Sequence, residues 1–350
     1  MPPDTSADPG EAPVYPFGDR APGPGETVEI APGLRWWRVP MSGPLKHVNG
    51  WLLDDADERG GGVAAVDTGT NSDAALAAWR TILGETRITR VVCTHMHPDH
   101  TGLAGWLCRQ HDAPLVMTRT EWLTLRMLSA DLHDEVPGEM RAFWRAAGWD
   151  EAQVAHAAAR GWRNFGRIVT RVPMAFTRIA DGDRLAIGGV DWRVITGSGH
   201  SPEHACLLDE ARGLLIAGDQ VLPRISSNIS LTVSEPDGDP LGDWLRSIAK
   251  FRTLPADLLV LPGHGDPFRG LHPRLDALDR EHRDRLDALE RHLAEPARAV
   301  DCFAQLFRRP IGPEVLGMAT GEALAHLRHL VVEGRAVRED RDGVWWYRRR

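Results

Sequence analysis

Residues 94–100 read Thr-His-Met-His-Pro-Asp-His and directly follow a short apolar run. Neutral imidazole is the commonest metal ligand in proteins, and carboxylates bind the same divalent ions. Side chains on an extended or turning segment alternate in direction, so His95 and His97 can face one ion while Asp99 and His100 face a neighbouring one. The pattern predicts a metal-binding turn at the end of a buried strand.

Four further segments combine a strand end, a glycine-containing turn and a side chain suited to metal binding. Glycine permits the tight turns that bring several strand ends around one point. Each segment alone is weak evidence, but the four together with the histidine turn argue against a solvated histidine-rich loop. The ligand-type residues of these segments are Asp67, His200, Asp219 and His264.

Strand and helix patterns alternate along residues 26–295, which predicts an α/β (α+β) layered domain. The predicted strands lie at 26–40, 49–54, 63–69, 88–93, 114–117, 183–187, 190–196, 205–208, 213–217 and 257–261. The predicted helices lie at 72–83, 102–111, 243–254 and 271–293. Residues 120–166 are helical and rich in large apolar side chains, and they predict an insertion over one edge of the core. Ordinary helix packing is the favoured interpretation, and a wall or lid for an apolar substrate is the alternative.

The two ends of the chain differ from this domain. Residues 1–25 contain seven prolines with glycines and acidic residues between them. This composition predicts a flexible N-terminal arm and not a signal peptide. Residues 296–350 predict helices followed by a β-hairpin, the order of a small winged-helix-like C-terminal domain.

Composition narrows the class of partner and the compartment. The formal net charge is −8, so the chain has no global basic field for nucleic acid, although a local patch is left open. The four cysteines are widely spaced with no C-x-x-C pair, which indicates a reducing cytoplasm. No apolar run reaches the roughly 18 residues of a membrane span. A small-molecule substrate is therefore expected, and a homodimer is left open.

On these residues the chain resembles the metallo-β-lactamase superfamily of hydrolases over about residues 27–295. The resemblance implies an αββα four-layer sandwich with two divalent metal ions at one edge, zinc being expected and iron or manganese the alternatives. It also implies that Asp67 orients the histidine turn from outside the ligand set. The implied ligands are His95, His97 and His200 for the first metal, Asp99, His100 and His264 for the second, and Asp219 as the bridge between them.

Two divalent ions about 3.5–4 Å apart can share a water molecule and lower its pKa toward neutrality, which gives a hydroxide nucleophile. The hydroxide would attack a carbonyl or phosphorus atom while the metals stabilise the developing charge. Asp99, Asp219 and His264 are the residues expected to take part in catalysis. An aspartate at position 219 resembles the thioesterase, lactonase and nuclease branches and differs from the true β-lactamases.

The favoured substrate class is a thioester or ester of the acyl-CoA or glutathione-thioester type, because residues 199–204 and 218–219 resemble the glyoxalase II-like branch. His47, Trp51 and Arg224 are the candidate substrate-binding residues. Three alternatives remain. The arginine-rich tail resembles the β-lactamase-like protein 2 group, some members of which are endoribonucleases, so an endoribonuclease or phosphodiesterase is one alternative. A lactonase is disfavoured by the scarcity of tyrosine, and a mononuclear iron persulfide dioxygenase would be distinguished by its metal content.

Overall fold

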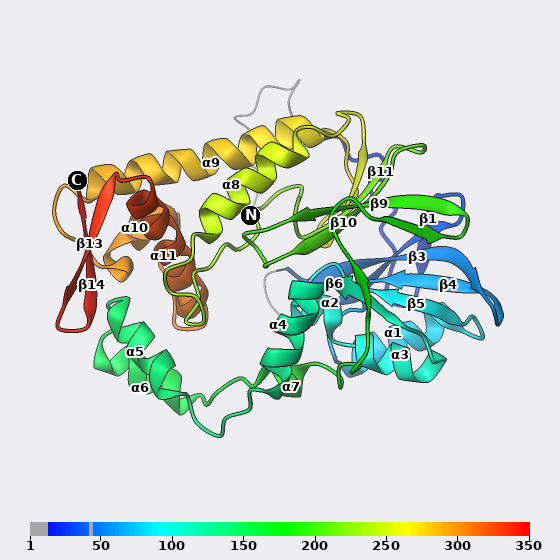
Figure 1. Cartoon of the computed structure of the whole chain (residues 1–350), viewed down its shortest axis with the longest axis horizontal. Coiled ribbons are helices and arrows are strands. Elements are labelled where there is room, and N and C mark those ends of the chain that lie inside the picture. The colour runs from blue at the N-terminus through cyan, green and yellow to red at the C-terminus, as the bar shows by residue number, and fades with distance from the viewer. Residues whose placement is uncertain (1–12, 42–44) are drawn as a thin grey trace.

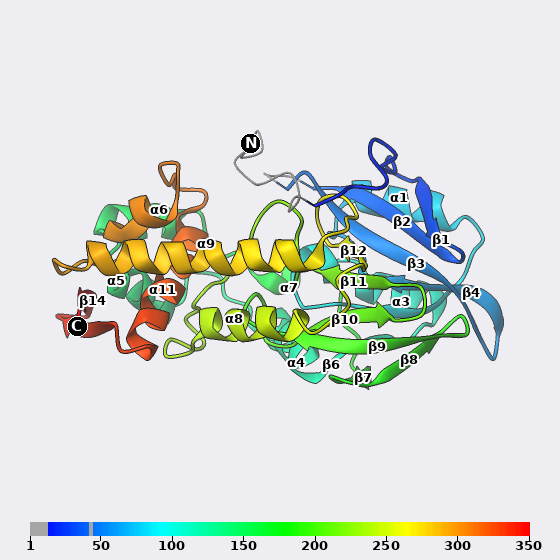
Figure 2. The ribbon, with the colours of Figure 1, turned by 90° about the horizontal axis from the view of Figure 1, so that it is seen from above.

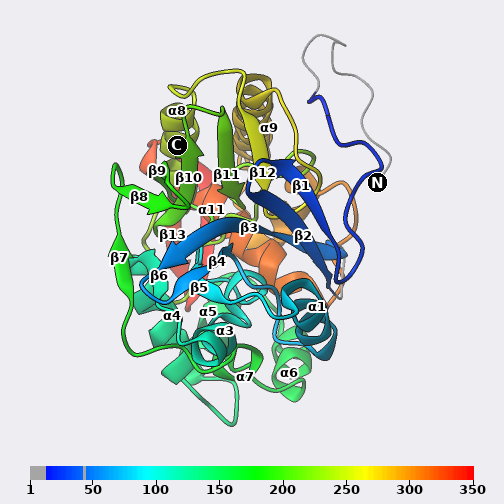
Figure 3. The same ribbon diagram turned by 90° about the vertical axis from the view of Figure 1, so that its right-hand side faces the viewer.

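The computed structural model describes residues 13–41 and 45–350 of the chain. Two β-sheets stack face to face, and helices cover both outer surfaces (Figures 1 and 3). One apolar core lies between the sheets, and a further core lies beneath each helical layer. The predicted αββα sandwich is therefore confirmed.

The first sheet holds seven strands in chain order, antiparallel from β1 to β4 and parallel from β4 to β7. The strands are β1 (Thr27–Ala31), β2 (Leu34–Pro40), β3 (His47–Asp57), β4 (Gly60–Val66), β5 (Ile88–Val92), β6 (Leu115–Thr118) and β7 (Thr177–Ile179). Helices α1 (Asp73–Leu83) and α3 (Ala104–His111) pack on its outer face. Ser72 caps α1, since its hydroxyl accepts a hydrogen bond from the Ala75 N–H at 3.2 Å. The short β7 was not predicted.

The second sheet holds five strands in the order β12-β11-β10-β9-β8. The strands are β8 (Arg184–Ile187), β9 (Val190–Gly197), β10 (His204–Asp209), β11 (Leu214–Gly218) and β12 (Leu259–Pro262). Helices α8 (Pro240–Phe251) and α9 (Leu271–His292) cover it. Helix α8 begins earlier than predicted because Pro240 occupies its first turn and the Asp239 carboxylate caps it.

The predicted insertion is divided between two surfaces, which corrects the expectation of one element over one edge. Helices α4 (Arg119–Ala130) and α7 (Phe165–Ile168) lie beside the first sheet, whereas α5 (Gly138–Ala146) and α6 (Glu151–Ala159) lie beside the C-terminal elements (Figures 1 and 2). The Trp149 indole donates a hydrogen bond to Thr320 Oγ1 at 2.9 Å. Trp149 also stacks on Trp144. The aromatic side chains of α5 and of the turn before α6 thus serve ordinary packing, and the apolar pattern could not reveal the surface against which they pack.

The C-terminal elements are η1 (Ala299–Cys302), α10 (Phe303–Leu306), α11 (Leu316–Val332), β13 (Ala336–Arg341) and β14 (Val344–Arg349). Helices precede a hairpin as expected, while the winged-helix assignment stays a prediction. Their buried side chains join the same apolar core as α8 and α9. Among the described residues, none of the helices combines the length and apolarity needed to cross a membrane.

The expected N-terminal arm falls in part on residues 1–12, which lie outside the described residues. The remainder lies against the sandwich instead of extending freely. Val14 forms a β-bridge with Arg269, and the Phe17 ring packs edge-on against Trp36 at 6.4 Å between centroids. A proline-rich composition predicts little regular structure. It does not reveal that a single aromatic side chain such as Phe17 can hold the segment against the sandwich.

Candidate metal centre

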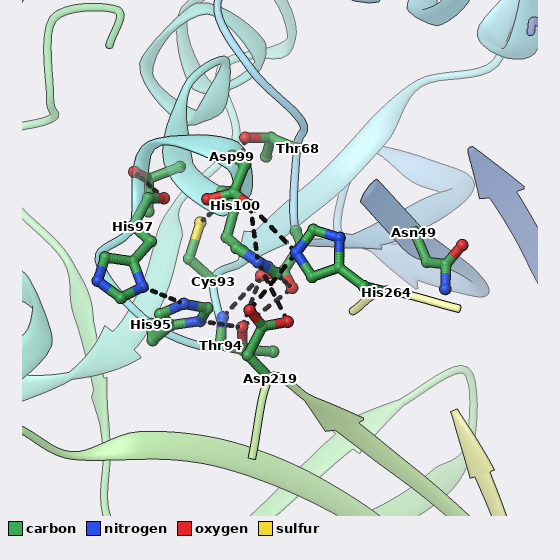
Figure 4. Close-up of polar contacts among 12 residues, drawn as sticks. Asn49, Thr68, Cys93, Thr94, His95, His97, Asp99, His100, Asp219 and His264 are labelled. Carbon is green, nitrogen blue, oxygen red and sulfur yellow. Dashed lines mark hydrogen bonds and ion pairs between the residues drawn. The ribbon is translucent and has the colours of Figure 1, made fainter. Parts of the chain in front are cut away.

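Five strands end at one edge of the sandwich, and each is followed by a ligand-type side chain. Parallel neighbours in each sheet bring their carboxyl ends to the same edge, and hydrogen bonds join the turns across the two sheets, as from Ala205 N–H to the Thr94 carbonyl at 2.8 Å. Short helix α2 (Pro98–Thr101) continues the histidine turn. The residues brought together are Asp67 after β4, His95 after β5, His200 after β9, Asp219 after β11 and His264 after β12. Figure 4 shows His95, Asp219 and His264 of this set.

The predicted ligands form two groups. In the three-histidine group, His97 Nδ1 lies 2.9 Å from His95 Nε2 and 3.0 Å from His200 Nε2. In the second group, Asp99 Oδ2 lies 3.2 Å from His264 Nε2 and 3.6 Å from His100 Nε2. Each group has ligand atoms close enough together to hold one ion.

Asp219 lies between the two groups. Its Oδ1 is 3.4 Å from His100 Nε2, and its Oδ2 is 3.4 Å from His264 Nε2 and 3.5 Å from His200 Nε2. Three of these buried atoms, His100 Nε2, His264 Nε2 and Asp219 Oδ1, have no hydrogen-bond partner among the described residues. A buried polar atom without a partner is costly, so the donor set fits divalent cations.

Burial controls the protonation of the imidazoles. It lowers the pKa of His95 and His200, and it lowers the pKa of His97 to about 3, so these three rings are neutral and offer lone pairs. Burial also opposes protonation of His264, but the carboxylates of Asp219 and Asp99 outweigh it and raise the pKa of His264 to about 10. A divalent cation would satisfy the same carboxylates.

Asp67 contacts the histidine turn at three points. Its carboxylate accepts hydrogen bonds from the Thr94 N–H at 2.8 Å and from the Thr94 hydroxyl, and it lies 2.8 Å from His100 Nδ1. Asp67 has a positive φ of 62°, a backbone conformation that aspartate tolerates better than most residues. These contacts are those expected of a residue that orients the turn.

The second ring nitrogen of His95, of His200 and of His264 is also held, which fixes the direction of the first. Such outer partners set the tautomer and orientation of metal-binding imidazoles. Main-chain carbonyls supply two of them. The pairs are His95 Nδ1 with Thr94 Oγ1 at 3.0 Å, His200 Nδ1 with the Asn228 carbonyl at 2.8 Å, and His264 Nδ1 with the His47 carbonyl at 2.7 Å.

Position 263 requires glycine because two side chains of the centre approach its backbone closely. A Cβ atom at this position would lie 2.2 Å from Asp219 Oδ1 and 2.8 Å from His100 Cε1. Any larger residue would therefore displace the two side chains that join the ligand groups.

The candidate substrate residues are placed differently from one another. His47 lies beside the centre and contacts it through its carbonyl oxygen, and burial lowers the pKa of its ring to about 4. Trp51 is 1% exposed and stacks on Trp36 between the sheets, so it does not line a cleft. Arg224 is exposed, and its guanidinium lies over the Tyr15 ring at 4.6 Å.

Sequence reasoning missed two buried residues of the centre. His204 Nε2 accepts the Asp219 N–H at 3.0 Å, and its ring stacks on His95. Glu121, in the first turn of α4, accepts the Met96 N–H at 2.9 Å and the Glu203 N–H at 2.7 Å. Burial raises the pKa of Glu121 to about 7. One carboxylate thus joins the turns that carry His95 and His97 to the turn that carries His200, and only an acidic residue in an apolar helix could have hinted at it.

Glutamine at position 121 is expected to lower the free energy of unfolding by about 1–3 kcal/mol, because an amide accepts one backbone N–H and presents its own N–H groups to the other. Chemical denaturation of the metal-free protein measures this loss. Glu203→Gln is the matched control, since within the described part of the chain the Glu203 carboxylate accepts only the Thr120 N–H, at 2.9 Å, and an amide oxygen can replace it. Equal losses of unfolding free energy for the two variants would contradict the role of Glu121 in joining the turns.

Two family profiles match the chain. The profile described as the metallo-beta-lactamase superfamily matches residues 43–264, and the one described as the metallo-beta-lactamase-like C-terminal domain matches residues 286–350. The crystal structure of a beta-lactamase domain protein from Burkholderia ambifaria superposes with a TM-score of 0.89 at 38% identity, covering 97% of this chain and 98% of that one.

The curated relatives with functional names include two that are named as hydrolases. A Bacillus subtilis protein named probable metallo-hydrolase YqjP is 24% identical over 79% of this chain and 86% of its own length. A hydroxyacylglutathione hydrolase from Cereibacter sphaeroides is 28% identical over 42% of this chain and 51% of its own length. The latter match thus spans about half of that relative.

Proposed function

Because the chain belongs to the metallo-beta-lactamase superfamily and is a metal-dependent hydrolase, we propose that it cleaves a thioester or ester at a two-metal centre. The observation that carries the proposal is the position of Asp219, whose two carboxylate oxygens lie 3.4–3.5 Å from nitrogens of both ligand groups. A shared carboxylate is what places two ions close enough to act on one water molecule.

His95, His97 and His200 would hold the first ion, and Asp99, His100 and His264 would hold the second. Bound metal supplies a hydroxide nucleophile near neutral pH and polarises the acceptor oxygen. Asp67 and Glu121 keep the ligand turns in register through backbone and side-chain hydrogen bonds. Zinc is the expected ion, and iron or manganese suits the same nitrogen and oxygen donors.

A thioester is the favoured substrate class. The name of the Cereibacter relative describes hydrolysis of an acylated glutathione, which is a thioester. The chain also carries a net charge of −8, which disfavours nucleic acid as the substrate.

The arginine-rich tail gives little support to the nuclease alternative. Five of its arginines are paired with carboxylates, so their charge is already compensated. The pairs are Arg335 with Asp287 and Glu290, Arg338 with Asp237, Arg341 and Arg348 with Glu339, and Arg349 with Glu290. Neither tyrosine supports a lactonase, since Tyr347 is buried and Tyr15 packs against Arg224.

Zinc-loaded protein is expected to release thiol from at least one acyl-CoA or acyl-glutathione, with a higher kcat/KM than for the oxygen ester of the same acyl group. A thiol-reactive chromophore measures the release, and single-stranded RNA serves as the comparison substrate. Metal analysis of protein purified without added metal separates a hydrolase with two ions from a dioxygenase with one iron. Lack of metal-dependent thiol release across the panel, or cleavage of RNA alone, would overturn the proposal.

A further inference from the structure

Residues 227–231 form a short segment that reaches the metal centre on one side. The Ser227 hydroxyl donates a hydrogen bond to the Asp219 carbonyl. The Asn228 carbonyl accepts a hydrogen bond from His200 Nδ1 at 2.8 Å. The segment therefore contacts both Asp219 and His200, and it fixes the direction of the His200 ring.

The other side of the same segment contacts helix α11 of the C-terminal part. The Leu231 N–H donates to the Gly321 carbonyl at 3.0 Å, and Ile229 and Leu231 are buried in the core that α11 lines. A Cβ atom at Gly321 would lie 2.7 Å from Ser230 Oγ, so this approach requires glycine within the helix. The helix and the segment are in direct backbone contact.

Glu322 adds a polar contact at the same place. Its Oε2 accepts from Asn228 Nδ2 at 3.4 Å, and its Oε1 pairs with Arg285 Nη1 of α9 at 3.1 Å. The Ser230 hydroxyl donates to Asn228 Oδ1 at 2.6 Å, which turns the amide nitrogen of Asn228 toward Glu322. The Glu322 side chain is 12% exposed. The largely buried Glu322 carboxylate therefore contacts Asn228, the residue whose main-chain carbonyl holds the His200 ring.

We propose that helix α11 of the C-terminal part positions the three-histidine group, with Glu322 acting on His200 through Asn228. The inference rests on the proposed metal centre and gives the C-terminal part a role in metal binding. Glu322 touches no predicted ligand, so it is a positioning residue. Outer partners of metal-binding histidines commonly change metal affinity by about 10–100-fold when they are removed.

Glu322→Ala is expected to weaken the binding of cobalt(II) by roughly 10-fold or more and to change the visible absorption of the bound ion, because the His200 ring is less well oriented. Affinity is measured by competition with a chelating dye on the whole 350-residue chain. Glu322→Gln should restore most of the affinity, since its amide oxygen can still accept from Asn228. Glu333→Ala, at the far end of α11 where Glu333 pairs with Arg335, is the matched control and should bind cobalt normally.

The thermal midpoint of the metal-free variants separates positioning from a structural role. A lowered midpoint with unchanged cobalt affinity and spectrum for Glu322→Ala would overturn the inference. Asn228→Ala removes the same contact from the other side and keeps the inference testable if Glu322→Ala does not fold; unchanged affinity in that variant would equally overturn it. Absence of cobalt binding by the unsubstituted protein would instead overturn the proposed metal centre, and this inference with it.

Discussion

Replacing Asp219 by alanine is expected to reduce kcat/KM for the best thioester substrate by on the order of 10³-fold. The reason is geometric, since the Asp219 carboxylate lies between both ligand groups and the variant leaves nothing to hold two ions at a common water molecule. The metal content is expected to fall from about two ions per chain toward about one. Steady-state kinetics and elemental analysis of the same preparation measure the two effects.

Asp209→Asn is the control for this prediction. Asp209 is also a buried carboxylate, 2% exposed, but it lies at the end of β10 away from the metal centre and binds Arg212. Its substitution should change stability and leave metal content unaltered. If Asp219→Ala retained two ions and near-normal turnover, the bridging role would be wrong.

Removal of metal by a chelator is expected to lower the thermal midpoint by on the order of 10 °C. A ligand that binds only the folded state stabilises it by about 4 kcal/mol at a thousandfold excess over its dissociation constant, and two such ions act together. For a chain of 350 residues, 1 kcal/mol corresponds to roughly 1–2 °C, because the entropy of unfolding grows with chain length. Differential scanning calorimetry with and without chelator measures the shift, and added zinc should reverse it.

Asp219→Ala provides an internal comparison for the calorimetry. Because this variant is expected to hold fewer ions, the chelator should shift its midpoint less than that of the unsubstituted protein. A midpoint that does not respond to chelator in either protein would contradict metal binding at this edge.

The predicted ligands could be found because each one comes after a strand that the apolar pattern reveals. Asp219 directly follows β11 and His95 comes three residues after β5, and the side chains of both strands are almost entirely buried. Such runs place the next side chains at a sheet edge. Layering of helices and sheets could be predicted from the same alternation. Gly263 could be suspected from its turn, although its 2.2 Å approach to Asp219 could not.

Other parts of the site leave little trace in the sequence. His47 and Asn228 contact His264 and His200 through main-chain carbonyls, and a carbonyl contact leaves no side-chain pattern in the sequence. Glu121 joins turns that are 25 and 82 residues away along the chain. Trp51 was expected at a cleft because of its position before a turn, but a large apolar ring gains more by burial between two sheets.

The aromatic rings of helix α5 and of the turn before α6 stay uncovered for a time while the ribosome synthesises the chain. They are synthesised well before the surface that buries them, since Trp149 and its partner Thr320 are 171 positions apart. At typical elongation rates the paired rings of Trp144 and Trp149 wait on the order of 10–30 s without that cover. The nascent chain therefore carries an exposed aromatic surface for about half of its synthesis, and chaperone capture during that interval would protect it from aggregation.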